Sequence, residues 1–514
     1  MDPMTETLEE VESICPDCLK EGKVAKIDAQ ILEENGKIWI KKECQEHGEF
    51  KSIYFGDPVL YGRWMKYKVQ GDGVENAEIE GGWLEDLPKL YPKHNSQTVL
   101  SNLMVTNRCN LRCSYCFMNA GAAGYVYEPS LEELEKMMRQ VREERPVPNK
   151  AIQITGGEPT VRDDLIEIGE LAEEMGFTHI QVNTNGIKLA EDADYCRKLR
   201  EAGVNTIYMS FDGMSKDANP WIEQNKKAVE NLREAELGVV LVPVPIKGSN
   251  LHELGDIIRY AADNVDIVRG VNFQPIAFCG RPENVPEENR TKRRVDYALL
   301  MEALEEDLGG QIKKEDFYPV PFVHPISKLM ENLKGEKQVE FTPNPGCGGA
   351  TYAFVQEGEL VPITRFIDVE GLMDLIRKQS EKSGMFKKAR IATSLAKNIM
   401  DYVDLDKAPE DLDIKDLIVN ALLRGDYGSL GKFHLKSLFI GSMWFQDPWN
   451  LNLERLKNCV IHYTTPDGIV PFCAYNGLGI GGKIRERYSM PIEEWEEKTG
   501  KKLKEDLWKG GPIS

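Results

Sequence analysis

The sequence lacks any long apolar run. No uninterrupted hydrophobic stretch among its 514 residues approaches the roughly 20 residues that a membrane-spanning helix needs. The first residues, MDPMTETLEEVES, are acidic and lack the apolar centre of a secretory signal peptide. We therefore expect a cytoplasmic protein without a transmembrane segment, a description that leaves room for transient, peripheral contact with a membrane.

Basic residues are in deficit. The chain has 64 Lys and Arg against 84 Asp and Glu, which gives a formal net charge of −20. A surface of this sign repels polyphosphates and anionic head groups. The composition therefore excludes nucleic acid as an expected partner.

Signs of disulfide bonding are also missing. The eleven cysteines occur in a large chain without a secretion signal, and closely spaced cysteines in that setting more often bind metal or carry out redox chemistry. We expect reduced cysteine ligands. The length predicts a catalytic core with added segments at both ends.

Residues 1–56 are predicted to form a small metal-binding β module. Cys15-Pro-Asp-Cys18 and Cys44-Gln-Glu-His47 flank a hairpin-like segment, and their paired spacing is typical of a tetrahedral site. A rubredoxin-like iron and a structural zinc would both satisfy it. We expect a structural role for this mononuclear metal.

A partial (β/α)6 barrel, similar to a TIM barrel, is predicted for residues 98–284, after a connector at 57–97. Strand-like and helix-like segments alternate six times, which favours an α/β fold with parallel strands and crossover helices. The predicted strands are TVLSNLMVT, AIQITGG, HIQVNTN, TIYMSFDG, GVVLVPVPI and VRGVNFQPI. The loops after their carboxyl ends are where such a fold places its active site.

Residues 285–514 are predicted to be a mostly helical extension that carries auxiliary cysteines and a substrate channel. The apolar stretch FHLKSLFIGSMWF at 433–445 could line such a channel. Core packing explains the same stretch equally well.

Three cysteines follow the first predicted barrel strand. Cys109, Cys113 and Cys116 lie on one loop, and three thiolates so close together can hold three corners of a [4Fe-4S] cubane and leave one iron open. The alternatives are a zinc site or a chance cluster, but zinc usually takes four ligands in paired spacings. The spacing therefore favours a cluster.

Polar and glycine residues end the next three predicted strands. Gly156, Gly157 and Glu158 could let the backbone approach a ligand and offer a carboxylate to an ammonium group, although GGEP alone is often an ordinary turn. The following strand ends carry four further candidates, which could equally be strand-end caps: Asn183, Asn185, Ser210 and Asp212.

Four cysteines beyond the triad could bind an auxiliary cluster. Cys347, Cys459 and Cys473 are candidate ligands, with Cys279 as the fourth. Free cysteine is also among the most buried residue types, so some of these four could be core residues.

The triad CNLRCSYC, followed one β/α unit later by GGEP, resembles the radical S-adenosylmethionine (SAM) superfamily. The likeness to one branch, the tetraether lipid synthases, runs nearly end to end. It rests on CPDC with CQEHGEF, on TNRCNLRCSYCFMNAGAAGYVYEPS, on ITGGEPTVRDDL, on FTHIQVNTNGIKLAE, on VRGVNFQPIAF and on HYTTPDGIVPFCAYN.

The resemblance implies an enzyme that cleaves SAM and joins unactivated carbons of archaeal isoprenoid ether lipids, with an electron donor such as ferredoxin. It also implies that Gly156, Gly157, Glu158 and the polar strand ends bind the cofactor. Residues 57–108 contain no cysteine where better known members carry a cysteine-rich segment. That departure favours a related cross-link, such as the bridge of H-shaped tetraethers.

Two other functions fit the same motifs. One is a radical SAM methyltransferase that acts on a pterin or a similar small molecule. The other is an electron-transfer or metal-binding protein, which would form no 5′-deoxyadenosine from SAM.

Overall fold

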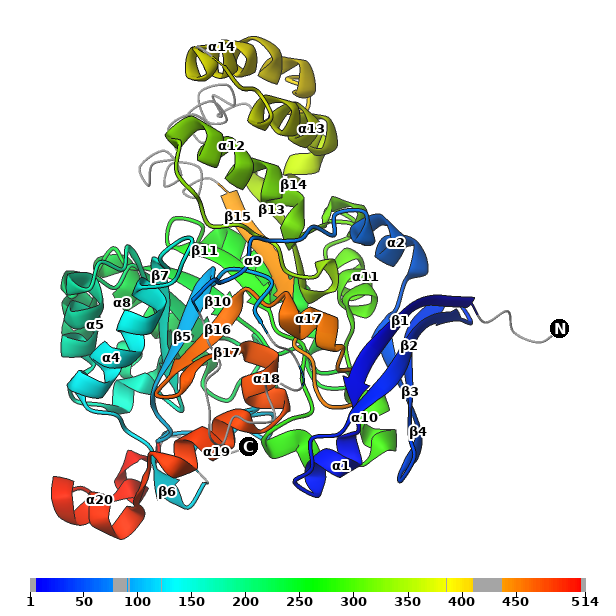
Figure 1. Ribbon diagram of the computed structural model, residues 1–514. Coiled ribbons are helices and arrows are strands. Elements are labelled where there is room, and N and C mark those ends of the chain that lie inside the picture. The colour runs from blue at the N-terminus through cyan, green and yellow to red at the C-terminus, as the bar shows by residue number, and fades with distance from the viewer. Residues whose placement is uncertain are drawn as a thin grey trace.

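One large sheet organises the protein. The computed structural model describes residues 6–76, 90, 93–121, 123–384, 386–409 and 437–509. The six predicted strands are all present, parallel and adjacent in chain order, so the α/β partial barrel is confirmed (Figure 1). They are β5 (Leu100–Thr106), β7 (Ala151–Gly156), β8 (His179–Thr184), β9 (Thr206–Ser210), β10 (Gly238–Val242) and β11 (Val268–Phe273).

Alternation along these strands separates a helix-facing side from an interior side. In β7, Ile152 and Ile154 belong to the main hydrophobic core, whereas Gln153 and Thr155, which alternate with them, do not. The core side is covered by helices such as α4, whose first turn is fixed by a capping box between Ser130 and Glu133. These helices are α4 (Leu131–Arg142), α5 (Leu165–Glu174), α6 (Ile187–Glu191), α7 (Ala193–Glu201), α8 (Ile222–Glu234) and α9 (Leu254–Asp263).

The C-terminal region, for which a mostly helical extension was predicted, adds strands to both edges of the sheet. β15 (Ser437–Met443) runs parallel to β11, and β16 (Ile461–Thr465) runs parallel to β5. Antiparallel strands follow outside them: β13 (Gly348–Gln356) with β12 (Tyr318–Pro319) and β14 (Glu359–Pro362) on one side, and β17 (Gly468–Pro471) on the other. Among the described residues, the outermost strands β12 and β17 do not pair, so the barrel stays open along a seam between these two edges.

The apolar stretch at 433–445 is largely a strand. Residues 437–443 form β15, while residues 433–436 lie outside the described part of the chain. A short apolar run that is buried on both faces has no period that separates strand from helix. Leu438 and Ile440 are completely buried in the main core, so packing explains these two side chains.

The N-terminal module is a four-stranded antiparallel sheet with one short helix. It contains β1 (Glu6–Ile14), α1 (Pro16–Lys20), β2 (Lys26–Glu34), β3 (Lys37–Cys44) and β4 (Gly48–Phe55). Asn35 and Gly36 both have positive φ, as the predicted hairpin turn requires. The module packs on the core through Lys42, whose buried Nζ donates to Ser13 Oγ and to Pro448 O at 2.6 Å.

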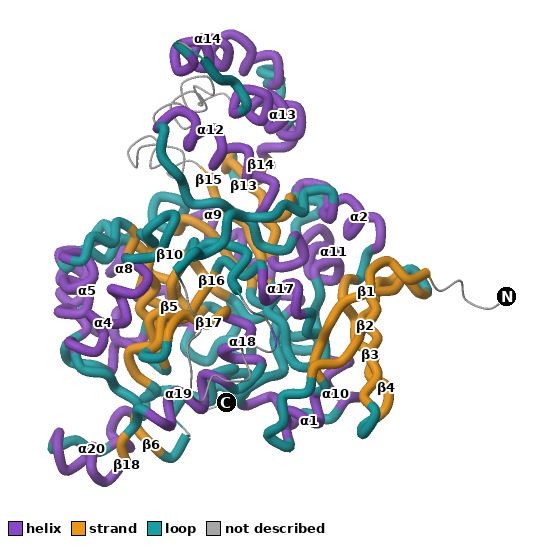
Figure 2. Tube along the Cα trace, viewed as in Figure 1, coloured by secondary structure: helices purple, strands orange, loops and turns teal. Residues whose placement is uncertain are grey.

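The remaining helices surround the barrel. α2 (Pro58–Met65) lies in the predicted connector, whose residues 77–89 and 91–92 are outside the described chain. A helical group, α12 (His324–Lys334), α13 (Val369–Ser380) and α14 (Lys387–Asn398), projects at the top of Figure 2. The others are α10 (Glu287–Arg293), α11 (Tyr297–Asp307), α17 (Leu453–Lys457), α18 (Phe472–Gly477), α19 (Ile480–Arg487) and α20 (Ile492–Thr499), and β6 (Tyr125–Val126) pairs with β18 (Met490–Pro491). None of the helices that the structure describes combines the length and the apolar character needed to cross a bilayer.

Candidate active site and metal centres

A cavity opens at the carboxyl ends of the barrel strands, where the sequence predicted the site. Its volume is about 1090 Å³, including the open mouth. Most of the predicted residues line it: Cys109, Cys113, Cys116, Gly156, Gly157, Glu158, Asn183, Asn185 and Ser210. The tertiary structure therefore brings the cysteine loop and three strand ends to one space.

The cysteine triad fits a multinuclear cluster better than a single ion. Its three Sγ atoms do not all lie within 4.8 Å of one another, as the ligands of one ion do. Burial raises the pKa of Cys113 to about 12 and that of Cys109 well above its ordinary value. A cluster held here would bind the three residues as thiolates.

Arg281 fastens the cysteine loop from the other side of the cavity. Its guanidinium donates hydrogen bonds to the backbone oxygens of Cys113 and Ala120, the latter at 2.8 Å. Its backbone N–H donates to Cys116 O at 3.0 Å. The sequence analysis named Cys279 as a candidate ligand and did not name Arg281. The only sequence signal for Arg281 was its position two residues after that cysteine.

Gly157 is where the backbone of β7 meets the cysteine loop. A Cβ atom there would lie 2.1 Å from the backbone oxygen of Arg108, and one at Gly156 would lie 2.4 Å from Thr106 O. Only glycine permits this approach. The glycine pair therefore acts through the close packing of the two loops.

Glu158 lines the cavity, and its carboxylate is hydrogen-bonded to neighbouring residues. The side chain is 1% exposed and accepts hydrogen bonds from Thr160, from Thr184 Oγ1 at 2.6 Å and from Asn185 N at 2.8 Å. Burial raises its pKa, which these hydrogen bonds oppose. The carboxylate ties β7 to β8 from within the protein.

The other polar strand ends divide into two pairs. Asn183 and Ser210 are half-buried and line the cavity. Asn185 instead donates to Asn110 Oδ1 at 2.7 Å. Asp212 accepts from the Tyr115 hydroxyl and from a backbone N–H of the segment after β10. Asn185 and Asp212 thus fix the cysteine loop, and Asn185 also lines the cavity together with Asn183 and Ser210.

The auxiliary cysteines gather beside the open seam of the barrel. Trp444 N, just after β15, donates to Cys347 O at 3.0 Å, and Gln446 N donates to Cys473 Sγ at 3.3 Å. Burial and the neighbouring thiols of Cys473 and Cys347 raise the pKa of Cys459. Their sulfur atoms do not form a group within 4.8 Å of one another, unlike the ligands of the N-terminal module.

Two further residues lie beside these thiols. Burial opposes the charge of Arg455, but Cys347, Tyr54 and Cys473 hold its pKa above the ordinary value. Cys279 is 3% exposed, and burial, Asp447 and Cys473 raise its pKa. Burial raises the pKa of Cys473, and the positive charge of Arg455 opposes this rise.

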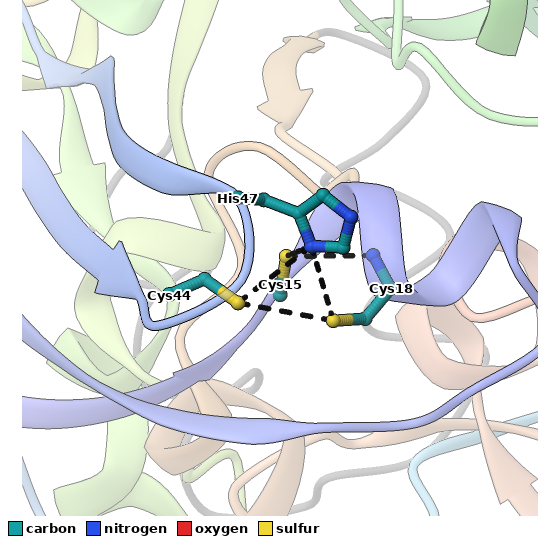
Figure 3. Close-up of side chains that lie close together, drawn as sticks. All are labelled: Cys15, Cys18, Cys44 and His47. Carbon is teal, nitrogen blue, oxygen red and sulfur yellow. Dashed lines mark hydrogen bonds between the residues drawn. The ribbon is translucent and has the colours of Figure 1, made fainter.

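The N-terminal module brings its four predicted ligands together (Figure 3). Cys15 and Cys18 come from the start of α1, and Cys44 and His47 from the turn between β3 and β4. His47 Nδ1 lies 3.6, 3.4 and 3.7 Å from the three sulfurs, and all four ligand atoms lie within 4.8 Å of one another. Bonds of about 2.3 Å to a tetrahedral ion would place sulfurs at roughly such separations.

A carboxylate supports this site from outside. Glu21 Oε1 lies 3.2 Å from His47 Nε2, the ring nitrogen that faces away from the sulfurs. Such a partner orients a histidine ligand and fixes its tautomer. The predicted N-terminal metal site is therefore confirmed as a preformed cluster of ligands.

Comparisons with known proteins agree with both centres. The family described as the Radical SAM superfamily matches residues 103–261, and the HMPTM N-terminal zinc ribbon domain matches residues 7–56. A 7,8-dihydro-6-hydroxymethylpterin dimethyltransferase from Methanocaldococcus jannaschii is 45% identical over 500 residues, which cover 94% of this chain and 96% of that protein.

More distant similarities are confined to part of the chain. A GTP 3′,8-cyclase from Desulforamulus reducens is 32% identical over 198 residues, 37% of this chain and 60% of that protein. Coproporphyrinogen III oxidase from Escherichia coli is 13% identical. The structural match covers 48% of this chain and 59% of that structure, with a TM-score of 0.31.

These findings correct part of the sequence interpretation. The predicted coupling of archaeal ether lipids, and with it the lipid partner, is wrong, because the relative that matches nearly the whole chain is a pterin dimethyltransferase. The radical SAM assignment is confirmed, and with it an enzyme that uses a [4Fe-4S] cluster and SAM. The chain belongs to the radical SAM superfamily and, within it, to the same family as the pterin dimethyltransferase of M. jannaschii.

Proposed function

We propose that the protein is a radical SAM methyltransferase whose substrate is a reduced pterin such as 7,8-dihydro-6-hydroxymethylpterin. The observation that carries this proposal is the 45% identity to the M. jannaschii enzyme over 94% of the chain. The cavity supports it, since the cysteine triad and the glycine pair meet at its wall.

Three thiolates would hold the cluster at the cavity, namely Cys109, Cys113 and Cys116. When bound, the cluster supplies the electron that splits SAM and yields a carbon radical able to abstract hydrogen from a substrate. A low-potential donor such as a ferredoxin is the proposed source of that electron.

The chain's own residues would position and shield this chemistry. Asn183 and Ser210 offer hydrogen bonds to the polar groups of SAM from the strand ends. Arg281 holds the cysteine loop in place through Cys113 and Cys116 and brings a positive charge toward a cluster that gains an electron. Phe117 and Phe445 line the same cavity and exclude water from the reacting carbon.

We further propose an auxiliary [4Fe-4S] cluster bound by Cys347, Cys459 and Cys473, with Cys279 as the candidate fourth ligand. The shared contact with residues 444–446 and the buried Arg455 support this set. For the N-terminal site, three thiols and one imidazole in tetrahedral spacing support zinc as the bound metal.

An anaerobic assay tests the function. Enzyme reconstituted with iron and sulfide is incubated with a strong reductant, SAM, 7,8-dihydro-6-hydroxymethylpterin and an isotope-labelled methyl donor. We expect 5′-deoxyadenosine and a pterin that carries labelled methyl groups. Formation of 5′-deoxyadenosine without any methylated pterin would reject the pterin substrate.

A cluster-deficient variant provides the control. Cys113→Ala leaves two thiolates at the cavity, too few to hold a cubane with one open iron. We expect it to lose both products. If it still formed 5′-deoxyadenosine, the assignment of the triad would be wrong.

A further inference from the structure

One wall of the cavity is made by residues outside the cysteine and glycine motifs. Gln274 and Ile276 follow β11, and Phe445 follows β15. Both segments lie on the side of the barrel that leads to the auxiliary cysteines, because Gln446, next to Phe445, donates its N–H to Cys473 Sγ at 3.3 Å. A molecule held at this wall would lie between the two groups of cysteines.

Gln274 presents a carboxamide to the cavity. Its backbone N–H donates to Pro243 O at 2.9 Å, which continues the pairing of β10 and β11 and fixes the residue's position. The side chain is half-buried, and its carboxamide makes no hydrogen bond with any of the described residues. A carboxamide offers a donor and an acceptor side by side.

Below this wall the barrel interior is polar. Asn272 lies two residues before Gln274 on the same face of its strand and is 2% exposed. Elsewhere in the barrel, Gln153 of β7 donates to Gln181 Oε1 of β8 at 2.9 Å. Barrel interiors are usually filled by branched aliphatic side chains. Buried amides in their place suit a polar ligand edge above them.

Phe445 supplies a rigid aromatic surface. Its ring stacks on Phe472 with centroids 3.9 Å apart and planes at 22°. Phe472 in turn contacts Phe117 with centroids at 5.6 Å. Because this packing immobilises the ring, Phe445 can receive a flat ligand without loss of side-chain entropy.

Charge at the cavity restricts the ligand class. Among the described lining residues, Arg281 carries the one basic side chain, and its guanidinium is engaged by backbone oxygens of the cysteine loop. The carboxylate of Glu158 is engaged by Thr160, Thr184 and Asn185. The wall therefore suits an uncharged ring and offers no group for a polyphosphate.

We propose that Gln274 and Phe445 form the substrate subsite, where Phe445 contacts the face of a flat, uncharged, nitrogen-rich heterocycle and Gln274 pairs with its edge of alternating donors and acceptors. A pterin ring has this chemistry. The inference rests on the proposed function, and it assigns the specificity of that function to two residues.

Binding measurements test the subsite. They use enzyme that has been reconstituted with iron and sulfide and that carries no bound pterin. Dissociation constants for 7,8-dihydro-6-hydroxymethylpterin and for SAM are measured separately under anaerobic conditions for the wild type, Gln274→Leu and Phe445→Leu. Each variant should weaken pterin binding by about tenfold or more, as loss of a buried hydrogen bond or aromatic contact predicts. The affinity for SAM should change by less than about twofold, because substitutions at a distant site alter a binding energy by no more than this.

Gln338→Leu is the matched control. Its carboxamide bonds surface groups of the 336–337 turn, and both affinities should stay as in the wild type. Iron content and circular dichroism check that each variant is folded and loaded.

Three results would overturn the inference. Unchanged pterin affinity in Gln274→Leu would remove the residue from the subsite, and an equal loss of SAM affinity would assign it to the cofactor. Binding of guanosine triphosphate by the wild type as tightly as the pterin would contradict the uncharged ligand class. If the wild type binds no pterin at all, the proposed function itself fails.

Discussion

Arg108 and Asp506 join the cysteine loop to the C-terminal segment. Arg108 Nη1 donates to Asp506 Oδ1 at 3.0 Å and Oδ2 at 2.8 Å, although 398 residues separate the two in sequence. The Arg108 side chain is 2% exposed, and its Nε also donates to Glu128 at 2.8 Å. The residue that precedes Cys109 is thus anchored by the end of the chain.

The same segment also covers the loop. Trp508 N donates to Asn110 O at 3.0 Å, and the indole packs at right angles to Trp221 in an apolar cluster that includes Cys109 and Cys113. The last described residues therefore form an outer wall for the cysteine triad.

We expect Asp506→Ala to loosen this anchor. Removing a charged hydrogen-bond acceptor from a buried guanidinium should lower the free energy of unfolding by about 1–3 kcal/mol. Iron content after reconstitution and the rate of cluster bleaching in air, followed by absorbance, should show a less protected cluster. The control is Asp163→Ala, which removes the partner of Lys501 at a site where the carboxylate is 80% exposed. Its cost should stay below about 1 kcal/mol, and equal bleaching in both variants would contradict the role of Asp506.

Gly157→Ala should disrupt the same loop from the barrel side. The new Cβ would meet the Arg108 backbone oxygen at 2.1 Å, and backbone cannot yield as a flexible side chain does. Overpacking of this kind costs about 1–3 kcal/mol, and we expect reconstituted iron to fall. In Gly62→Ala the added methyl meets nothing within 4 Å in helix α2, so helix propensity should stabilise the protein by about 0.5–1 kcal/mol. Full iron loading of Gly157→Ala would refute the close contact.

Glu144 should make stability depend on pH. Burial raises its pKa to about 8, and hydrogen bonds with Thr98 lower it only in part. In the unfolded chain the carboxyl ionises near its ordinary value of 4.5. The folded state therefore binds the proton more tightly than the unfolded state does. The resulting stabilisation of the folded protein is complete below pH 4.5 and is lost as the pH rises toward 8. The loss amounts to about 1.4 kcal/mol per pH unit across this window.

Thermal unfolding of Glu144→Gln at several pH values between 5 and 8 measures this effect. The neutral isostere should flatten the decline in Tm seen in the wild type. Glu143→Gln, at the exposed neighbouring position, should keep the wild-type decline. Parallel Tm curves for the wild type and Glu144→Gln would show that the carboxyl does not titrate in this window.

Removing the metal from the N-terminal module should unfold that module. The four ligands close a loop from Cys15 to His47, and without an ion their thiols are left buried beside one another. We expect a strong chelator to increase amide hydrogen exchange across β1 to β4 while the barrel helices stay protected. Metal analysis of the untreated protein should give zinc at one equivalent beyond the iron of the clusters. Unchanged exchange after complete zinc loss would contradict a structural role.

Cys473→Ser should separate SAM cleavage from product formation. If Cys473 ligates an auxiliary cluster, its loss should lower iron content and abolish the methylated pterin, while 5′-deoxyadenosine still forms at the intact triad. Cys196→Ser, in helix α7 where the thiol donates to the Leu189 and Asp192 oxygens, should keep both products. A full yield of methylated pterin from Cys473→Ser would remove this residue from the proposed set.

Local sequence patterns were sufficient for much of the fold and for both main metal centres. The six barrel strands and the turn at Asn35-Gly36 follow from periodicity and turn chemistry, because side chains alternate at short range. The pairing of β15 with β11 and of β16 with β5 could not be predicted in this way, because it joins segments far apart in the chain. The predicted lipid substrate was wrong, because motifs assigned to the cluster and the cofactor do not specify what the enzyme acts on.

The sequence by itself indicated which side chains can bind metal, since ligand type and spacing are properties of a few neighbouring residues. Only the tertiary structure decided what the other side chains do. It turned the carboxylate of Glu158 inward to Thr184 and Asn185, placed Asp506 on Arg108, and brought Gln274 and Phe445 to one wall. These roles depend on contacts between distant segments, and the burial that settles them exists only once the chain has folded.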